Sequence, residues 1–131
     1  DTINGEGGND LIVGLVGNDT LLGGDGDDRI FGNSGNDDIA GGQGNDTMTG
    51  QQGIDTYRFE LLSGVDRITD FAIGVDQLDV SIFFNEFAQV QAALADVNNT
   101  ARLTFSAGNF VNLSGVQSAQ LTEGDFIFDG G

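Results

Sequence analysis

A strict period of nine residues runs through the first half of this chain. Aspartate recurs at that spacing without a miss, as Asp1, Asp10, Asp19, Asp28, Asp37, Asp46 and Asp55. Two residues after each aspartate comes a large apolar or aromatic side chain: Ile3, Ile12, Leu21, Ile30, Ile39, Met48 or Tyr57. One glycine opens each complete unit, and a second stands two residues before its aspartate. A repeat of this length indicates a solenoid, in which each unit buries its apolar side chain by stacking on its neighbours.

The unit is long enough for a loop of about six residues and a strand of about three. The middle side chain of the strand then points into the core, and its two neighbours point outward. Glycines at the first and fourth places allow positive φ, which turns the loop carbonyls inward. If each unit is half a coil, residues 18 apart stack. The aspartates then form two ladders, with Asp1, Asp19, Asp37 and Asp55 on one edge and Asp10, Asp28 and Asp46 on the other.

These stacked carboxylates oppose folding unless a cation lies between them. Strands ~4.8 Å apart bring neighbouring carboxylates close enough to repel by on the order of 3 kcal/mol per pair. One buried aliphatic side chain per repeat contributes only about 1.5–3 kcal/mol in the other direction. Calcium suits oxygen ligands on a flexible loop better than magnesium does, and no histidine or cysteine is present to favour a transition metal. We therefore expect about four or five Ca²⁺ ions between successive loops of each edge.

The charge and composition exclude several other functions. The net charge is −17, from 21 acidic residues against four basic ones. Such a chain repels nucleic acid and anionic membranes, and no apolar stretch is long enough for membrane insertion. The absence of histidine, cysteine and lysine removes the common catalytic triads, thiolate zinc sites and phosphate-binding loops. Since the aspartates form a ladder and not a cleft, we predict no enzymatic activity.

The second half has a different texture from about residue 59. Nine of the ten phenylalanines follow Gly53, and glycine becomes sparse. Alternation predicts strands at 67–71 and 77–81, and Asn85 is placed to cap a helix over 86–97 whose apolar face carries Phe87, Val90, Leu94 and Val97. Further strands are expected around Leu103/Phe105, Val111/Leu113 and 126–128. We predict an all-β to α+β protein, with a parallel β-roll over 1–58 and a small mixed cap over 59–131.

On these motifs the chain resembles the RTX (repeats-in-toxin) family. The units GGDGDDRIF and GGQGNDTMT are close to its consensus, and VDRITDFAIGVDQLDVS and the closing DFIF are similar to the C-terminal segment of serralysin-type proteins and of alginate-epimerase R-modules. The resemblance implies a right-handed parallel β-roll that folds on calcium outside the cell. It also implies export by the type I secretion machinery, guided by a signal within 59–131. Loop carbonyls would join the aspartates as calcium ligands, here those of Gly8, Gly17, Gly26, Gly35, Gly44 and Gly53.

Several points stay open at this stage. The chain starts in mid-repeat, so we expect an upstream domain of the same secreted polypeptide. Four units carry a non-glycine residue at the second place of the consensus: Glu6, Leu15, Asn33 and Gln51. The cap aspartates Asp66, Asp70, Asp76 and Asp79 fit a further ion, turn capping or a solubilising role at strand edges. Leu11, Val13 and Phe31 should face outward on one sheet.

Two other functions deserve comparison with the calcium-dependent fold. An accessory polysaccharide-binding module would need a basic or aromatic groove, and four arginines scattered along the sequence (Arg29, Arg58, Arg67 and Arg102) are poorly suited to build one. An ice-binding solenoid would need a regular outward column of threonine. The corresponding column is broken by Leu11, Arg29 and Asp38.

Overall fold

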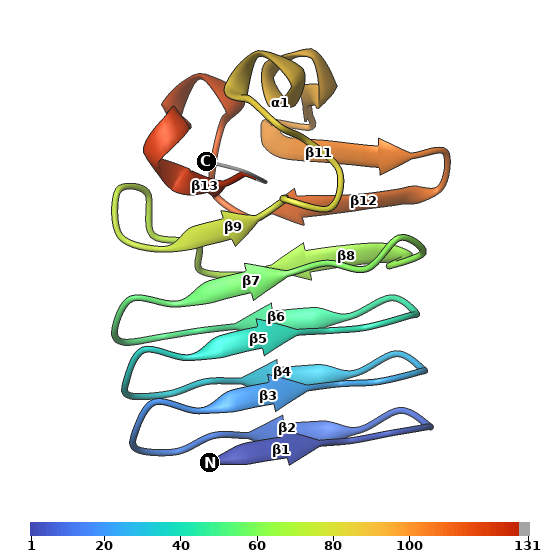
Figure 1. Cartoon of the computed structure of the whole chain (residues 1–131), viewed down its shortest axis with the longest axis vertical. Helices are drawn as coiled ribbons and strands as arrows, with labels where there is room; N and C mark the ends of the chain where they lie inside the picture. The colour runs from blue at the N-terminus through green and yellow to red at the C-terminus, as the bar shows by residue number, and fades with distance from the viewer. Residues whose placement is uncertain (129–131) are drawn as a thin grey trace.

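The computed structural model describes residues 1–128, so the last three residues of the predicted segment 59–131 lie outside the described part. The repeats form seven strands of three residues each: β1 (Thr2–Asn4), β2 (Leu11–Val13), β3 (Thr20–Leu22), β4 (Arg29–Phe31), β5 (Asp38–Ala40), β6 (Thr47–Thr49) and β7 (Thr56–Arg58). Successive strands alternate between two facing sheets, so two repeats complete one coil (Figure 1). The predicted parallel β-roll is confirmed.

Strands of the same sheet pair in parallel with a register of 18 residues. Thr2 lies beside Thr20 and Thr20 beside Asp38 in one sheet, while Leu11 lies beside Arg29 in the other. The register follows from the sequence, because a shift by one residue would turn the apolar column outward.

The apolar column fills the space between the two sheets. Ile12 is 4 % exposed, and the following members of the column, from Leu21 to Tyr57, are fully buried. The flanking residues face outward, as predicted for Leu11, Val13 and Phe31 on the sheet that contains β2 and β4. Each half-coil therefore contributes one large side chain to a narrow core.

Both sheets continue beyond residue 58. In one sheet β7 pairs with β9 (Gln77–Asp79), which pairs with β13 (Phe126–Ile127). In the other, β6 pairs with β8 (Val65–Ile68), and β12 (Asn109–Leu113) follows in parallel. The antiparallel strands β11 (Thr100–Ser106) and β10 (Leu94–Val97) complete that sheet, and the helix α1 (Phe87–Ala93) lies over the end of the roll (Figure 1). Short 3-10 turns at Ser118–Gln120 and Glu123–Asp125 precede β13. The division into 1–58 and 59–131 stays a prediction.

The helix prediction was too long. The chain is helical only to Ala93, and Leu94 takes extended φ and ψ of −87° and 138°. From Leu94 to Val97 the backbone pairs with β11, so a tertiary contact outweighs the apolar pattern that extended to residue 97. Asn85 is not the N-cap either, because the helix follows Glu86.

The strand predictions in the same region were correct in kind. The expected segment 77–81 corresponds to the shorter β9, and the pair around residues 107–109 corresponds to β11 and β12. The expected segment 67–71 overlaps β8 only at residues 67 and 68, because β8 begins and ends earlier than predicted. Among the described residues, no helix is long and apolar enough to cross a membrane.

Candidate functional site

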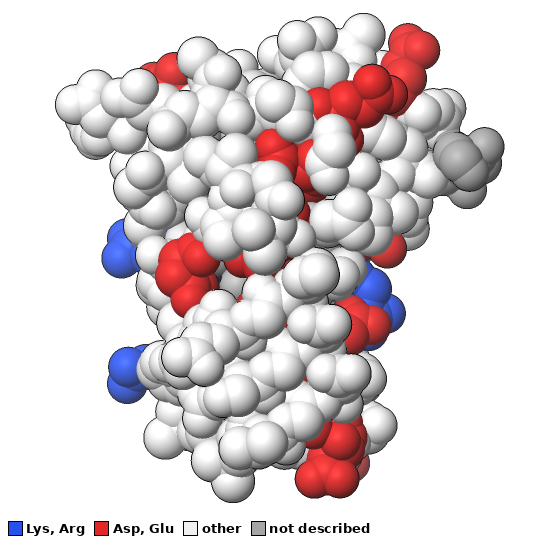
Figure 2. Space-filling view, turned by 90° about the vertical axis from the view of Figure 1, so that its left-hand side faces the viewer, with Lys and Arg blue, Asp and Glu red and all other residues white. Residues whose placement is uncertain are grey.

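The repeat loops lie along the two edges of the roll, where consecutive coils place equivalent residues one above another. Loops 5–10, 23–28 and 41–46 follow one edge, and loops 14–19, 32–37 and 50–55 follow the other. In the edge-on view of Figure 2, acidic side chains are spread over the surface, whereas the basic ones lie only at the sides of the view. The two predicted aspartate ladders occupy these edges.

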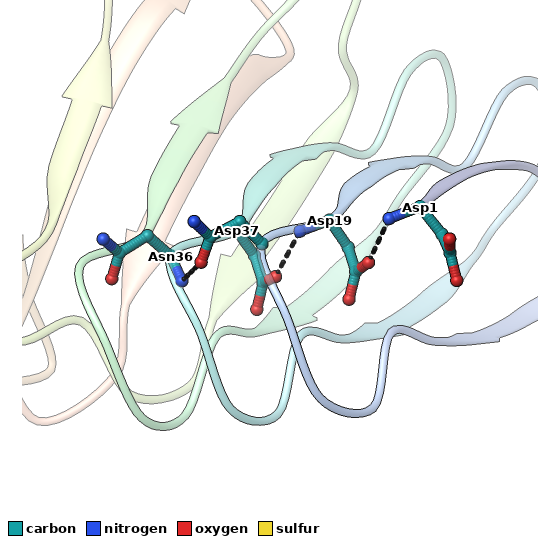
Figure 3. A network of polar contacts seen from close by, with 5 residues as sticks. Asp1, Asp19, Asn36 and Asp37 are labelled. Carbon is teal, nitrogen blue, oxygen red and sulfur yellow. Dashed lines mark hydrogen bonds and ion pairs between the residues drawn. The ribbon is translucent and has the colours of Figure 1, made fainter.

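Each ladder aspartate is tied to the coil before it. Asp28 Oδ1 accepts a 2.8 Å hydrogen bond from the backbone N–H of Asp10, and Asp37 Oδ1 accepts one of 2.9 Å from that of Asp19. The link recurs from Asp28 to Asp46 and from Asp37 to Asp55. The backbone nitrogen of Asp1 makes the same contact with Asp19, so Asp1, Asp19 and Asp37 stack directly (Figure 3). The predicted ladder geometry is thus present on both edges.

A second ladder, which the sequence analysis missed, stands one residue earlier. Asn9 Oδ1 accepts a hydrogen bond from the N–H of Asp27 at 2.8 Å, and Asn18 Oδ1 accepts one from the N–H of Asn36 at the same distance. The same link joins each later pair of coils, with acceptors Asp27, Asn36 and Asn45. In this ladder each side chain accepts a hydrogen bond from the next coil, whereas each aspartate side chain accepts one from the preceding coil. Its signal in the sequence was the Asn or Asp that precedes the repeat aspartate in five of the six complete units.

The second carboxylate oxygen of the aspartate in each complete repeat is buried and has no partner. Among the described residues, buried Oδ2 atoms without a hydrogen bond are those of Asp10, Asp19, Asp28, Asp37, Asp46 and Asp55. A buried acceptor left unsatisfied costs about 1–3 kcal/mol, and more when it is charged. One such atom per complete repeat marks a recurring place for a cation.

Backbone carbonyls converge on these orphaned oxygens. A Cβ built on Gly5 would lie 2.5 Å from Asp10 Oδ2 and 2.7 Å from the carbonyl oxygen of Gly23, in the next coil. A Cβ on Gly14 would lie 2.9 Å from Asp19 Oδ2 and 2.8 Å from the carbonyl oxygen of Gly32. The glycine that opens each repeat is therefore needed for space: a side chain there would displace the oxygens.

Positive φ belongs to the second and fourth places of the loop, not to the first. This corrects the expectation that the opening glycine provides it, because none of Gly5, Gly14, Gly23, Gly32, Gly41 and Gly50 has positive φ. The four residues that replace glycine at the second place do: Glu6 (68°), Leu15 (72°), Asn33 (68°) and Gln51 (65°). The loop keeps one geometry in all six units, at the cost of a strained backbone in four.

The predicted carbonyl ligands occupy the fourth place. The carbonyls of Gly8, Gly17, Gly26, Gly35 and Gly44 each face a glycine of the next coil, so closely that a side chain there would collide with them. Within the described residues, these carbonyl oxygens accept no backbone hydrogen bond. The Gly53 carbonyl has no such facing glycine, since an added Cβ at Gly74 would meet nothing within 4 Å.

Burial raises the pKa of four of the ladder carboxyls. It brings the pKa of Asp46 and Asp55 to about 7, against backbone hydrogen bonds that lower it. The pKa values of Asp28 and Asp37 are raised by burial as well. Without a cation, folding therefore places a proton or an unfavourable charge at these positions.

Carboxylates alone do not make a complete metal site. Among the described residues, no group of three or more His, Cys, Asp or Glu side chains converges on one point. An ion at the orphaned oxygens would therefore have to take backbone carbonyls as well, which are hard oxygen ligands of the kind calcium prefers.

The cap aspartates, which the sequence analysis left open, divide into two kinds. Asp66 and Asp76 continue the ladders, because their Oδ1 atoms accept the N–H of Asp46 and Asp55, both at 3.0 Å. Asp70 instead accepts the N–H groups of Gly50 and Gln51, and Asp79 accepts both hydrogen bonds of Ser81. Asp79 therefore caps its own turn, whereas Asp70 joins its loop to the start of loop 50–55.

Comparison with known proteins agrees with this geometry. The family described as the RTX calcium-binding nonapeptide repeat (4 copies) matches residues 1–21 and 22–57. A search of curated proteins gave no match.

Solved structures share the fold over nearly the whole chain. The AlgE6R3 subunit of the mannuronan C5-epimerase from Azotobacter vinelandii has a TM-score of 0.75 at 29 % identity, covering 96 % of this chain and 81 % of that one. The AlgE6R2 subunit of the same enzyme has a TM-score of 0.69 at 27 % identity, covering 98 % and 92 %. The extracellular lipase LipA from Serratia marcescens shares the fold at 20 % identity, with a TM-score of 0.66 over 96 % of this chain and 20 % of the lipase.

Proposed function

Because residues 1–57 are RTX calcium-binding nonapeptide repeats, we propose that this chain is a non-catalytic module that folds when calcium enters the loops on both edges of its β-roll. About four or five ions bind between aspartates 18 residues apart. The side-chain ligands are Asp1, Asp10, Asp19, Asp28, Asp37, Asp46 and Asp55, and the backbone ligands are the carbonyls of Gly8, Gly17, Gly26, Gly35, Gly44 and Gly53.

One observation carries the proposal: every complete repeat holds a buried carboxylate oxygen without a partner. Six such atoms in one small protein would be a large penalty if they stayed unsatisfied. A hard cation shared by two coils satisfies the oxygens of both and reverses the repulsion between them. Binding and folding are then one event, because the coils that build the site exist only in the folded chain.

The proposed setting is extracellular. Extracellular modules bind calcium at roughly 10⁻⁴–10⁻³ M, so such a site stays empty in the cytosol and fills outside the cell. In our proposal the chain passes the type I secretion machinery unfolded and folds on arrival, as the C-terminal part of a larger secreted polypeptide. The likeness in fold to an extracellular lipase supports this setting.

Circular dichroism during a calcium titration tests the proposal. We expect a chain with little β-structure in chelator and a cooperative gain of β-signal at sub-millimolar to millimolar calcium. Magnesium at equal concentration serves as the control and should produce a much smaller gain. A full β-signal in chelator at neutral pH would contradict the proposal.

A second candidate function, the binding of an anionic polysaccharide, is favoured by one observation. Three of the four arginines lie in a single cross-strand row on the outer face of one sheet: Arg29 neighbours Thr47, Thr47 neighbours Arg67, Arg67 neighbours Asn112, and Asn112 neighbours Arg102. The expectation that the arginines are scattered was therefore wrong for these three. Arginines on alternate strands recur about every 10 Å, which suits a linear polymer with regularly spaced carboxylates.

At one end of this row, the Arg102 side chain is held by two contacts. Its guanidinium lies 4.0 Å from the ring centroid of Phe110, and its Nε donates a 3.0 Å hydrogen bond to Asn112 Oδ1. Arg67, Arg102 and Asn112 also line a shallow hollow of about 220 Å³. The likeness to subunits of a mannuronan epimerase makes a uronate polymer the first ligand to test.

Calorimetry with short uronate oligosaccharides in calcium tests this second function. We expect weak, salt-sensitive binding that is lost when Arg29→Gln, Arg67→Gln and Arg102→Gln are combined. Arg58→Gln is the matched control, because Arg58 lies on the other sheet, where its Nε contacts Asp38 at 2.6 Å. Equal binding by the triple variant and the wild type would remove the row as a binding surface.

A further inference from the structure

On the edge that carries loop 41–46, a repeat-like loop follows the last repeat that the family model matches. Gly64-Val65-Asp66 lies beyond residue 57, where the match to the repeat family ends, and the loop that carries it is longer than a repeat loop by two residues. It nevertheless stacks on loop 41–46 as the ordinary loops stack on one another. Beyond it, Arg67 and Ile68 pair in parallel with Thr47 and Met48.

Three contacts between loop 41–46 and this segment repeat the contacts that loop 23–28 makes with loop 41–46. The N–H of Asp46 donates to Asp66 Oδ1 at 3.0 Å, as the N–H of Asp28 donates to Asp46 Oδ1 at 2.8 Å. Asn45 Oδ1 accepts the N–H of Val65 at 2.9 Å, as Asp27 Oδ1 accepts the N–H of Asn45 at 2.8 Å. Gly64 has φ of +79° and faces the carbonyl of Gly44.

The oxygen atoms for an ion are also present. Asp46 and Asp66 are each 1 % exposed, and Asp46 Oδ2 has no hydrogen-bond partner. Both residues line a solvent-open hollow of about 260 Å³, which gives an ion a path to the carboxylates. The Gly44 carbonyl is directed at the new loop.

The opposite edge ends differently. Gly74-Val75-Asp76 occupies the equivalent place, but Asp76 Oδ2 accepts the N–H of Ala72 at 2.9 Å. A Cβ built on Gly50 would lie 2.5 Å from the hydroxyl of Tyr57. The opening glycines of the first four complete units face a carbonyl of the next coil at this place, whereas Gly41 has only Asp46 atoms as its nearest neighbours. At this edge both carboxylate oxygens of Asp76 therefore accept protein hydrogen bonds and a phenol lies beside Gly50, while Asp55 Oδ2, like Asp46 Oδ2, has no partner.

We propose that Asp46 and Asp66 hold a further calcium ion, beyond those between the recognised repeats, and that the edge ending at Asp76 holds no counterpart. The inference rests on the proposed calcium-binding function and deepens it. The two edges of the roll then bind different numbers of ions. Both carboxylate oxygens of Asp76 accept protein hydrogen bonds, whereas the last carboxylate of the other edge, Asp66, shares an ion with Asp46.

Native mass spectrometry of the full chain in calcium tests this asymmetry. Asp66→Asn should bind one ion fewer than the wild type, whereas Asp76→Asn, the matched control, should bind the same number as the wild type. Far-UV circular dichroism at saturating calcium checks that both variants fold. An unchanged ion count in folded Asp66→Asn, or an equal loss in both variants, overturns the proposal.

Terbium-soaked crystals of the wild-type chain give a test that needs no variant. Anomalous density should lie between loops 41–46 and 59–66 and be absent between loops 50–55 and 69–76. Density confined to the recognised repeats would overturn the inference while leaving the proposed function intact. A wild-type chain that binds no calcium at all would instead refute the proposed function.

Discussion

The repeat coils and the C-terminal part share two continuous sheets but are stabilised in different ways. Each repeat half-coil buries one large apolar side chain and one carboxylate with an orphaned oxygen. The C-terminal part packs a cluster of aromatic rings against its core: the partly buried Phe83 and Phe105 stack at 4.3 Å, and the buried Phe59 lies 5.0 Å from Phe105. The contrast teaches that the same backbone arrangement can depend on a cation in one region and on apolar burial in the next.

Removal of calcium should therefore have the largest effect on stability, and it should destabilise the repeat coils more than the C-terminal part. We expect amides of β1 to β6 to lose protection from hydrogen exchange in chelator, while β11 and β12 keep more of theirs. Hydrogen exchange followed by mass spectrometry, with and without calcium, measures the difference. Uniform loss across both regions would show that they fold as one cooperative unit.

Acidification should partly replace calcium in the repeat coils. Burial raises the folded-state pKa of Asp46 and Asp55 to about 7 and that of Asp66 to about 8, above the ordinary value of 3.8. A raised carboxyl pKa contributes stability that is fully present below the unfolded value and is lost as pH rises through the folded one. In chelator, the β-signal should be greater at pH 5 than at pH 8. Calcium affinity should change in the opposite direction, weakening below pH 7.

A core truncation in the C-terminal part should act independently of calcium. Leu103 is fully buried in β11, and Leu103→Ala should cost about 2–5 kcal/mol. Chemical denaturation at several calcium concentrations measures the loss, which should stay nearly constant across them. A loss that disappears in saturating calcium would mean that the ions stabilise this region as well.

Within the repeats, an internal ladder position should matter more than a terminal one. Asp28 and Asp37 have ladder neighbours on both sides, whereas Asp55 is followed by the hydrogen-bonded Asp76. Asp28→Asn should weaken calcium binding by at least the roughly tenfold typical when one partner of a metal site is removed. Asp55→Asn should weaken it less. Calcium titrations of the two variants decide the order, and equal losses would argue against shared ions.

The smallest expected effect is a gain in stability. Leu15 is 62 % exposed and has φ of +72°, a conformation that costs roughly 1–2 kcal/mol for a residue with a Cβ. Leu15→Gly should therefore stabilise the calcium-bound repeats by about 1 kcal/mol. Thermal unfolding in calcium measures it, with Asn33→Gly as a milder comparison because asparagine tolerates this region better. A loss of stability would indicate that the Leu15 side chain makes a favourable contact.

Local periodicity accounts for what could be predicted. The short strands, the 18-residue register and the two aspartate ladders follow from columns that repeat every nine residues, because each coil contacts chiefly the coil before and after it. The Asn ladder was within reach of the same reasoning, since Asn9, Asn18, Asn36 and Asn45 fall in one column. Its amides are neutral, so no repulsion between stacked side chains marked this column as the repulsion between carboxylates marked the aspartate column.

The sequence by itself determined the roll, its inward column and the edges on which carboxylates collect, since each of these depends on residues nine or 18 positions apart. Only the tertiary structure decided the features built from non-repeating contacts. Leu94 leaves the helix because its backbone pairs with β11, Arg67 and Arg102 share a row because β12 pairs with β8, and Asp66 joins a ladder across an enlarged loop. No period in the sequence encodes these contacts, because their partners lie at irregular separations along the chain.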